Sequence, residues 1–335
     1  MGSPQARWHV LTPNIGAVAT TMLPSAELRP DVLPTDRLTA TGKAVPELRE
    51  ELRRIPNLLN AWSVVFCWVQ ILGPIYLAVR LDHPLMWIAA FLLCGRGFAL
   101  LNILGHEAAH RLLFSKKSVN DFVGRWFLAY PAFTPIDPYR RSHMAHHREE
   151  FGPEEPDMNL YNGYPVTRAS LRRKLTRDAF FNSGWKNARG LLRAAQKAPV
   201  ARTILAVQLV IAILFVVAGH PWLFLFLWVA PWMTVWRVLN RLRAIAEHGG
   251  MTRSPDRRLT THHVRQGLWP RFWIAPYKTG WHLAHHVDIG VPFRNLPKFH
   301  RELVASGWVP GGLEYPSYFA LWRALSSRPD ATPPE

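Results

Sequence analysis

Long hydrophobic runs, separated by polar and basic segments, dominate the pattern of this 335-residue chain. A helix needs about 20 mostly apolar residues to cross the hydrocarbon core of a membrane. Four runs are long enough or nearly so: 58–79, 85–105, 203–219 and 221–239. The first two are joined by the short segment RLDHP, and the last two meet at a GHP turn. The pattern therefore predicts four transmembrane helices arranged as two hairpins.

The segments outside these runs are polar and divide the chain into three predicted parts. Residues 1–56 form an N-terminal arm without an apolar core typical of a signal peptide, and the arm ends in the amphipathic stretch VPELREELRRIPN. Such a stretch is typical of a helix lying at the water–headgroup interface. The membrane domain covers 57–305, and 306–335 is a C-terminal tail. Within 111–200, RWFLAYPAF is apolar but too short to span a membrane.

The charge of the chain changes how the polar segments are interpreted. The formal net charge is +17, and 49% of the residues are hydrophobic. The basic residues lie between apolar runs, which favours a membrane over nucleic acid as the partner. Positive segments stay on the cytoplasmic side of a membrane, so both termini and the region 111–200 are predicted to be cytosolic. Cys67 and Cys94 lie inside apolar runs, and we expect no disulfide.

Histidines gather in three short motifs, HEAAH, HMAHH and HLAHH, and a further histidine stands in EHGG. On a helix, positions i, i+3 and i+4 share one face. The predicted topology places all four segments at the same membrane face, where their imidazoles can meet. The nine candidate metal ligands are His106, His110, His143, His146, His147, His248, His282, His285 and His286.

The residue types restrict the kind of metal site. No cysteine lies near the motifs, and imidazole suits zinc, copper, iron and nickel. Nine ligands exceed the needs of one ion, so two ions with open coordination positions are the simplest arrangement. Open positions are typical of a catalytic site. Carboxylates near the motifs are candidates to accept the outer ring N–H groups: Glu107, Glu150, Glu154, Asp157, Glu247 and Asp288.

The remaining histidines and one arginine are expected to serve other roles. His262 and His263 are predicted to lie at the surface or in a loop, and His300 is predicted to pack locally. His9, His83 and His220 are isolated. Arg96, inside the second run, is costly in lipid, and we expect it to pair within the bundle or to contact a polar group of a substrate.

The three motifs, in this order and spacing, resemble the histidine boxes of the membrane fatty acid desaturase family, whose members are di-iron enzymes. GPEEPD after the second box and LPKFH after the third are also similar to that family, and the likeness covers roughly 57–305. The resemblance implies that all nine histidines ligate iron. One feature departs from the pattern, because Ala244 stands where some relatives use an asparagine to hold a water ligand.

The resemblance also implies a fold and an activity. The expected fold is an all-α, four-helix membrane bundle with a cytosolic helical cap carrying the di-metal site. The expected reaction is O₂-dependent desaturation of a long-chain fatty acyl or related lipid chain at two iron ions. Electrons would come from an external carrier, either a ferredoxin or a cytochrome b5-type protein. We expect no nucleic-acid partner.

Three alternative functions are compatible with parts of the sequence. A hydroxylase of a lipid, carotenoid or alkane would use the same metal site. HEAAH also satisfies the HExxH pattern of zinc proteases, with Glu107 as the general base, but that leaves the other clusters unexplained. A metal transporter or sensor would require ligands within the spans, whereas these histidines cluster at one end.

Overall fold

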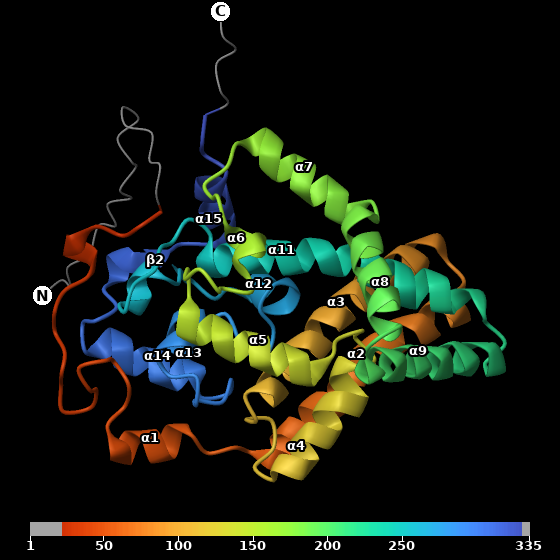
Figure 1. The fold of residues 1–335 in the computed structure, drawn as a ribbon, viewed down its shortest axis with the longest axis horizontal. Helices are drawn as coiled ribbons and strands as arrows, with labels where there is room; N and C mark the ends of the chain where they lie inside the picture. The colour runs from red at the N-terminus through yellow and green to blue at the C-terminus, as the bar shows by residue number, and fades with distance from the viewer. Residues whose placement is uncertain (1–21, 330–335) are drawn as a thin grey trace, which may run out of the picture.

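The computed structural model describes residues 22–329, which are mostly helical (Figure 1). The ends of the predicted N-terminal arm and C-terminal tail, 1–21 and 330–335, lie outside the described residues. The long helices are α2 (Asn57–Leu81), α3 (Pro84–Ala109), α5 (Ile136–Glu149), α7 (Arg168–Ala179), α8 (Asn182–Ala195), α9 (Pro199–Val217) and α11 (Val235–His248). The predicted all-α class is confirmed in the sense that helices dominate.

Shorter elements connect these helices. The short helices are η1 (Ala26–Leu28), α1 (Pro46–Leu52), α4 (Lys117–Val123), α6 (Met158–Tyr161), α10 (Ala230–Met233), η4 (Arg257–Leu259), α12 (Leu268–Trp273), α13 (His282–Val287), α14 (Leu296–Ala305), η5 (Gly311–Leu313) and α15 (Tyr318–Leu325). Two segments, η2 (Gly124–Ala129) and η3 (Phe224–Val229), are π-helical. The two-residue strands β1 (His263–Val264) and β2 (Glu314–Tyr315) pair in parallel, with His263 opposite Glu314.

Three helical segments among the described residues are long and apolar enough to cross a membrane: Pro46–Leu81, Pro84–Ala109 and Pro199–Val217. The first two correspond to the predicted spans 58–79 and 85–105, and the third to 203–219. Helix α3 begins with Pro84, and the ring nitrogen Nδ1 of His83 accepts a hydrogen bond from the Leu85 amide. A proline fits the first turn of a helix, because the amide nitrogen there needs no helical partner.

The fourth predicted span, 221–239, is not one uninterrupted helix. It consists of η3, α10 and the start of α11, and the backbone departs from helical geometry at Thr234, where φ is −123° and ψ is −84°. Pro231 lies within this run and lacks the amide that a helix interior requires. The four-helix bundle of two hairpins therefore remains a prediction.

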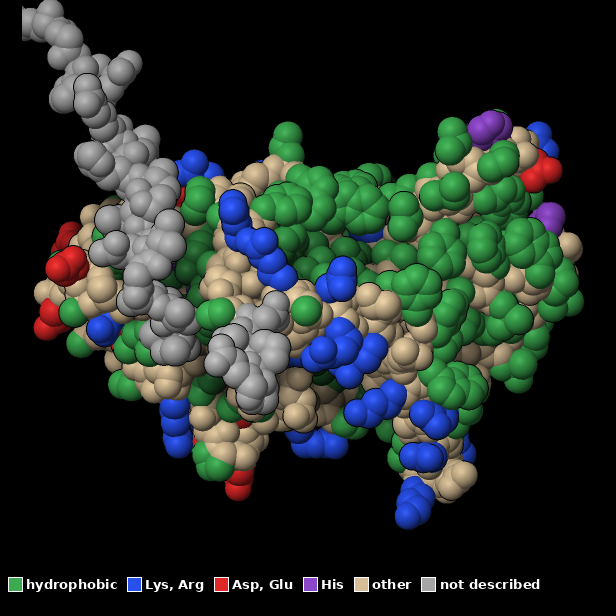
Figure 2. Space-filling model, turned by 90° about the horizontal axis from the view of Figure 1, so that it is seen from above, with side chains coloured by type: hydrophobic (Ala, Val, Ile, Leu, Met, Phe, Trp, Pro, Cys, Tyr) green, Lys and Arg blue, Asp and Glu red, His purple; other side chains and the backbone are tan. Residues whose placement is uncertain are grey.

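The surface is divided into an apolar part and a polar part. Figure 2 shows hydrophobic side chains gathered on the right half of the molecule, where α2, α3 and α9 lie in Figure 1. Helix α9 contributes exposed Leu209, Val210, Leu214 and Val217, with exposed fractions from 56% to 80%. Exposed apolar surface of this size is expected where lipid rather than water covers the protein.

Helix α3 lies at the centre of the fold, buried through most of its second half. A Cβ atom at Gly95 would lie 2.3 Å from the Val235 side chain, so only glycine permits this approach of α11. Small residues at such contacts are typical of helix packing in membranes. The Arg96 guanidinium, next in the chain, donates to the Phe272 carbonyl at 2.7 Å and to Gln70 Oε1 at 2.9 Å. Arg96 thus pairs inside the protein, the first of the two roles expected for it.

The predicted amphipathic helix corresponds to α1. Its apolar residues Leu48 and Leu52 are buried inside the protein. The Asn295 amide donates to the Leu52 carbonyl at 2.8 Å, and Glu51 pairs with Lys298 of α14. The helix is confirmed, while its place at a lipid interface remains a prediction.

Candidate metal centre

Four helices deliver the nine predicted ligands to one region of the protein. They come from the C-terminal end of α3, from α5, from the last residue of α11, and from α13. All except the partly buried His110 are buried. The helical spacing that the sequence predicts is therefore present, and the side chains meet in the interior between these elements.

The first group contains five imidazoles from three helices. The ring nitrogens of His106, His110, His143, His147 and His285 all lie within 4.8 Å of one another. The Nε2 atoms of four of them approach one another, with 2.9 Å between His143 and His110, 3.0 Å between His147 and His143, and 3.2 Å between His285 and His147.

The second group contains the other four imidazoles. Ring nitrogens of His146, His248 and His286 lie within 4.8 Å of one another. The Nε2 atom of His282 is 3.1 Å from that of His248 and 3.0 Å from that of His286. The two groups are adjacent, because the rings of His147 and His286 are 4.4 Å apart.

The outer nitrogens of the four-histidine group are all anchored. His248 Nδ1 donates to the Thr260 carbonyl at 2.9 Å, and His146 Nδ1 donates to Glu155 at 2.9 Å. His286 Nδ1 donates to Glu150 at 2.5 Å.

The last ring of this group, His282, has its Nδ1 3.4 Å from Glu247. Two of the three anchoring carboxylates also pair with arginines, Glu150 with Arg257 and Glu247 with Arg243. Such partners fix the tautomer and orientation of a metal-ligating histidine.

Only some of these partners were predicted from the sequence. Glu150 and Glu247 were among the expected carboxylates, but Glu155 was not, and its neighbour Glu154 is exposed instead. Asp288 pairs with Arg53 at 2.8 Å rather than with a ligand. Asp157 lies within 4.8 Å of ring and carboxylate atoms of His146 and Glu155.

Glu107, the general base of the protease alternative, is directed elsewhere. Its Oε1 accepts a hydrogen bond from the Phe293 amide at 3.1 Å, and Glu107 belongs to none of the candidate metal groups among the described residues. This orientation does not favour an HExxH mechanism.

The surface interpretation of the paired histidines His262 and His263 is wrong. Their exposed fractions are 3% and 6%. His262 donates to the Gly249 carbonyl at 2.7 Å, and His263 packs against the ring of His300 at 4.5 Å. These contacts hold His262 against the turn after α11 and His263 against His300. Both rings are therefore buried, although the local sequence is polar.

The donor set fits metal ions. Burial, followed by the neighbouring imidazoles, lowers the pKa of His143, His147 and His285 well below the usual value. Burial also lowers the pKa of His110, to about 3. The rings are then neutral near pH 7, which is the form that binds a metal. Both ring nitrogens of His106 are buried without a hydrogen-bond partner, a costly arrangement that a metal ion would relieve.

His146 is the exception among the ligands. Burial disfavours its charged form, but the hydrogen bond and charge of Glu155 outweigh this and raise the pKa of His146. The Glu155 carboxylate therefore places negative charge beside the outer nitrogen of His146. A carboxylate in this position raises the basicity of a metal-ligating histidine.

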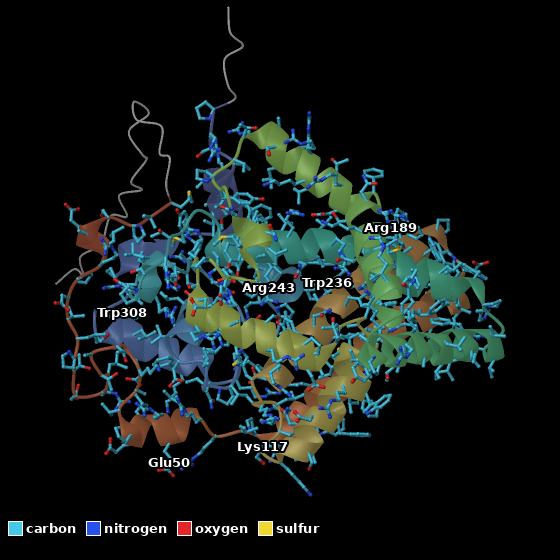
Figure 3. All side chains as sticks on the ribbon, viewed as in Figure 1. Glu50, Lys117, Arg189, Trp236, Arg243 and Trp308 are labelled. Carbon is cyan, nitrogen blue, oxygen red and sulfur yellow. The ribbon has the colours of Figure 1, made fainter. Side chains whose placement is uncertain are left out.

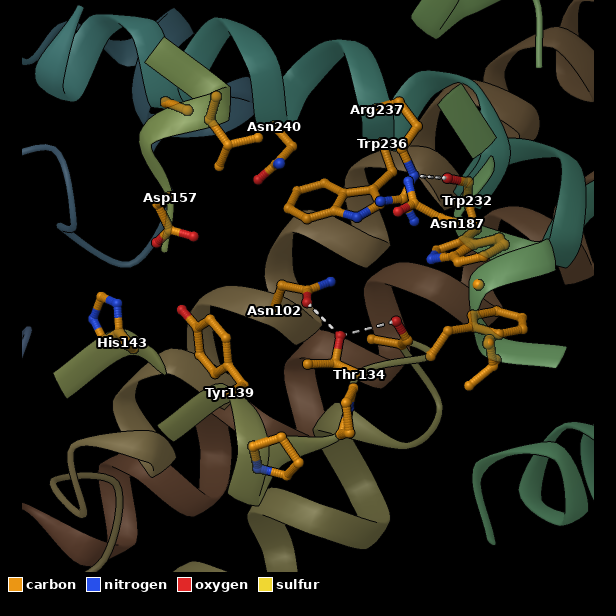
Figure 4. A pocket seen from close by; sticks show the side chains of 18 of the residues that line it. Asn102, Thr134, Tyr139, His143, Asp157, Asn187, Trp232, Trp236, Arg237 and Asn240 are labelled. Carbon is orange, nitrogen blue, oxygen red and sulfur yellow. Dashed lines mark hydrogen bonds between the residues drawn. The ribbon is translucent and has the colours of Figure 1, made fainter. Parts of the chain in front are cut away.

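A cavity of about 900 Å³ adjoins the histidines (Figure 4). His143, His146, His248 and His282 form part of its wall, which α8, α11 and the start of α9 complete. Inside the cavity, Thr134 donates to Asn102 Oδ1 at 3.0 Å (Figure 4). A ligand in this cavity would contact both histidine groups, so the cavity is the candidate substrate site.

A second hollow of about 1110 Å³ lies between α2 and α9. Its wall is apolar, with Trp68, Leu72 and Ile211 among the lining residues, and no histidine belongs to it. This hollow therefore contains none of the predicted metal ligands among its lining residues.

Comparisons with known proteins show what the chain is similar to. A family model described as fatty acid desaturase matches residues 82–319. The chain is 27% identical over 256 residues to the dihydrorhizobitoxine desaturase of Bradyrhizobium elkanii, covering 67% of this chain and 71% of the relative.

Two cyanobacterial relatives cover more of the chain. The sn-1 oleoyl-lipid 12-desaturase of a Picosynechococcus species is 22% identical, with 85% of each chain covered. The ferredoxin-type sn-1 acyl-lipid omega-3 desaturase of a Nostoc species is 23% identical, with 81% of each chain covered.

Proposed function

Because the chain belongs to the fatty acid desaturase family, we propose that it is a di-iron membrane enzyme that introduces a double bond into an aliphatic chain. The convergence of nine imidazoles in two adjacent groups beside one cavity carries this proposal. Two iron ions with O₂ would supply the oxidising power to break two unactivated C–H bonds. Each double bond then consumes one O₂, two electrons and two protons, and releases two waters.

The chain's own residues would perform the binding and orientation. We propose that the five-histidine group holds one ion and the four-histidine group the other. Glu150, Glu155 and Glu247 would orient the second set of rings through their hydrogen bonds. The cavity would place the substrate chain against His143 and His146 on one side and His248 and His282 on the other.

Electrons would come from an external carrier protein. The net charge of +17 would attract an acidic carrier, and one relative's name includes ferredoxin. We propose a ferredoxin as the donor, with a cytochrome b5-type protein as the other carrier to test. The relatives' names point to acyl-lipids in two cases and to dihydrorhizobitoxine in the third. The substrate proposed here is a long-chain acyl or related lipid chain, with the active site on the cytoplasmic face.

The proposal is tested by metal content and product together. We expect two irons per purified chain, and new double bonds in the lipids of an expression host with a simple lipid profile. One zinc per chain would contradict the di-iron assignment, and new hydroxyl groups without double bonds would replace desaturation with hydroxylation.

Replacing a proposed ligand should abolish the reaction. His146→Ala removes a ring from the four-histidine group, so we expect complete loss of product and fewer than two irons per chain, with membrane insertion unchanged. His220→Ala, which lies outside both histidine groups, is the control. It should retain product formation and the iron content of the unchanged chain. Activity retained by His146→Ala would exclude His146 as an iron ligand.

A further inference from the structure

One face of α11 lines the cavity from end to end. Trp236, Arg237, Asn240, Ala244 and His248 all belong to its wall, and Figure 4 shows the first three along the same helix. From Arg237 onward these residues are three or four positions apart, which keeps them on one side of the helix, and Trp236 lies four positions before Asn240. The cavity therefore begins at the N-terminal end of α11 and reaches the histidine centre at its C-terminal end.

Arg237 lies at the end of the cavity away from the histidines. Its Nε donates to the Trp232 carbonyl at 3.1 Å, and its guanidinium lies 4.6 Å from the Trp232 ring centroid. Among residues 22–329 it has no ion pair and no other hydrogen bond. The other two arginines of α11 differ, because Arg241 pairs with Asp178 and Arg243 with Glu247.

The side chains around Arg237 are also polar and border the cavity. Asn240 lines the cavity one helical turn away, and its side chain has no hydrogen bond to another described residue. Asn187 of α8 lies beside Arg237 in Figure 4, and Lys186 borders the same wall. The Asp178 carboxylate attracts Arg237 electrostatically but is paired with Arg241, so Arg237 itself makes no ion pair. A partly buried cation without an ion pair is costly, and a purely aliphatic ligand would leave that cost in place.

We propose that Arg237 binds the anionic end, a carboxylate or phosphate, of an otherwise aliphatic substrate. The substrate chain then runs along α11 to the histidine centre. A guanidinium presents two parallel N–H groups to a carboxylate or phosphate, which gives strong and oriented binding. The inference rests on the proposed function, because it assigns the orientation of the substrate in the same cavity.

In this arrangement, the length of α11 determines which bond of the substrate chain is oxidised. His248 follows Arg237 by eleven positions, which corresponds to roughly 16 Å along the helix axis. The oxidised bond should therefore lie at a fixed distance from the anionic end. Lengthening the substrate at its methyl end should leave that position unchanged.

Binding of matched ligands to the full purified chain, without reductant so that no turnover occurs, tests the inference. The probes are palmitate, methyl palmitate and hexadecyl phosphate, which share an aliphatic chain and differ in charge. A charged hydrogen-bonded pair is lost with the ester, so we expect palmitate or hexadecyl phosphate to bind roughly tenfold or more tightly than methyl palmitate. The tighter of the two identifies the anionic group.

Variants assign the preference to Arg237. Arg237→Gln should reduce the preference for the anion to less than about threefold, and Arg237→Lys should restore part of it. Arg189→Gln is the matched control, because Arg189 lies on α8 next to the cavity wall but does not line it (Figure 3). It should bind like the unchanged chain.

Two outcomes would overturn the inference. One is equal binding of the ester and both anions by the unchanged chain. The other is a preference that survives in a folded Arg237→Gln variant or disappears equally in Arg189→Gln. Neither outcome depends on iron content or product, so a failure here is distinguishable from a failure of the proposed desaturation.

Discussion

Glu155 is buried and accepts the hydrogen bond of His146 Nδ1, while its neighbour Glu154 is exposed. Glu155→Gln keeps the shape of the side chain but removes the charge behind the ring. Loss of such a partner typically weakens metal binding by about 10- to 100-fold. We therefore expect iron to be lost at a lower concentration of competing chelator, measured as iron per chain.

Glu154→Gln provides the control for this change, because it alters charge at the adjacent position without touching a ligand. Its iron retention should match that of the unchanged chain. Equal iron loss in both variants would show that general charge, rather than the contact with His146, controls retention.

The same pair shows what can be predicted at the scale of single residues. The histidine clusters were predictable because helical spacing alone places His143, His146 and His147 on one face. Of their carboxylate partners, Glu150 and Glu247 were expected but Glu155 was not, because Glu154 and Glu155 lie on an irregular segment where no period fixes the direction of a side chain. His262 and His263 were misjudged for a related reason, since contacts distant in sequence bury them.

Helix α8 depends on a close contact with the end of α10. A Cβ atom at Gly184 would lie 2.4 Å from the Met233 carbonyl oxygen, so Gly184→Ala must push the two elements apart. Overpacking of this kind costs about 1–3 kcal/mol. We expect a lower midpoint in thermal unfolding of the detergent-purified protein.

Gly190 offers a matched substitution in the same helix. A Cβ atom there would meet nothing within 4 Å, and alanine favours a helix over glycine by about 0.5–1 kcal/mol. Gly190→Ala should leave the unfolding midpoint unchanged or raise it. A similar decrease in both variants would contradict the role of the Gly184 contact.

At the scale of elements, hydropathy predicted the uninterrupted helices better than the helical run that the backbone breaks. Helices α2, α3 and α9 correspond to continuous apolar runs. The run 221–239 is equally apolar, but Thr234 interrupts it where the chain turns into α11. The polar lining of the cavity was not predictable, because Arg237 and Asn240 face it only after α8 and α11 pack together.

At the scale of the whole molecule, the predicted membrane topology makes a labelling prediction. Glu154→Cys lies in the region expected in the cytosol, and His220→Cys lies in the connection expected on the opposite side. An impermeant maleimide should label His220→Cys in intact cells, and Glu154→Cys only after the membrane is broken.

The native cysteines provide the background for this experiment. Cys67 and Cys94 are both buried, so the unchanged chain should label weakly in either condition. Labelling of Glu154→Cys in intact cells would reverse the proposed orientation.

The nine histidines come from segments far apart in the chain, and they meet only when α3, α5, α11 and α13 have all docked. An unfolded chain therefore presents no comparable site, and the proposed metal binding would stabilise the native state alone. At a metal concentration 100 times the dissociation constant, this linkage contributes about 2.7 kcal/mol to the free energy of unfolding. Cells deprived of the metal should then contain less of the protein itself, because chains without bound metal unfold more often and are degraded.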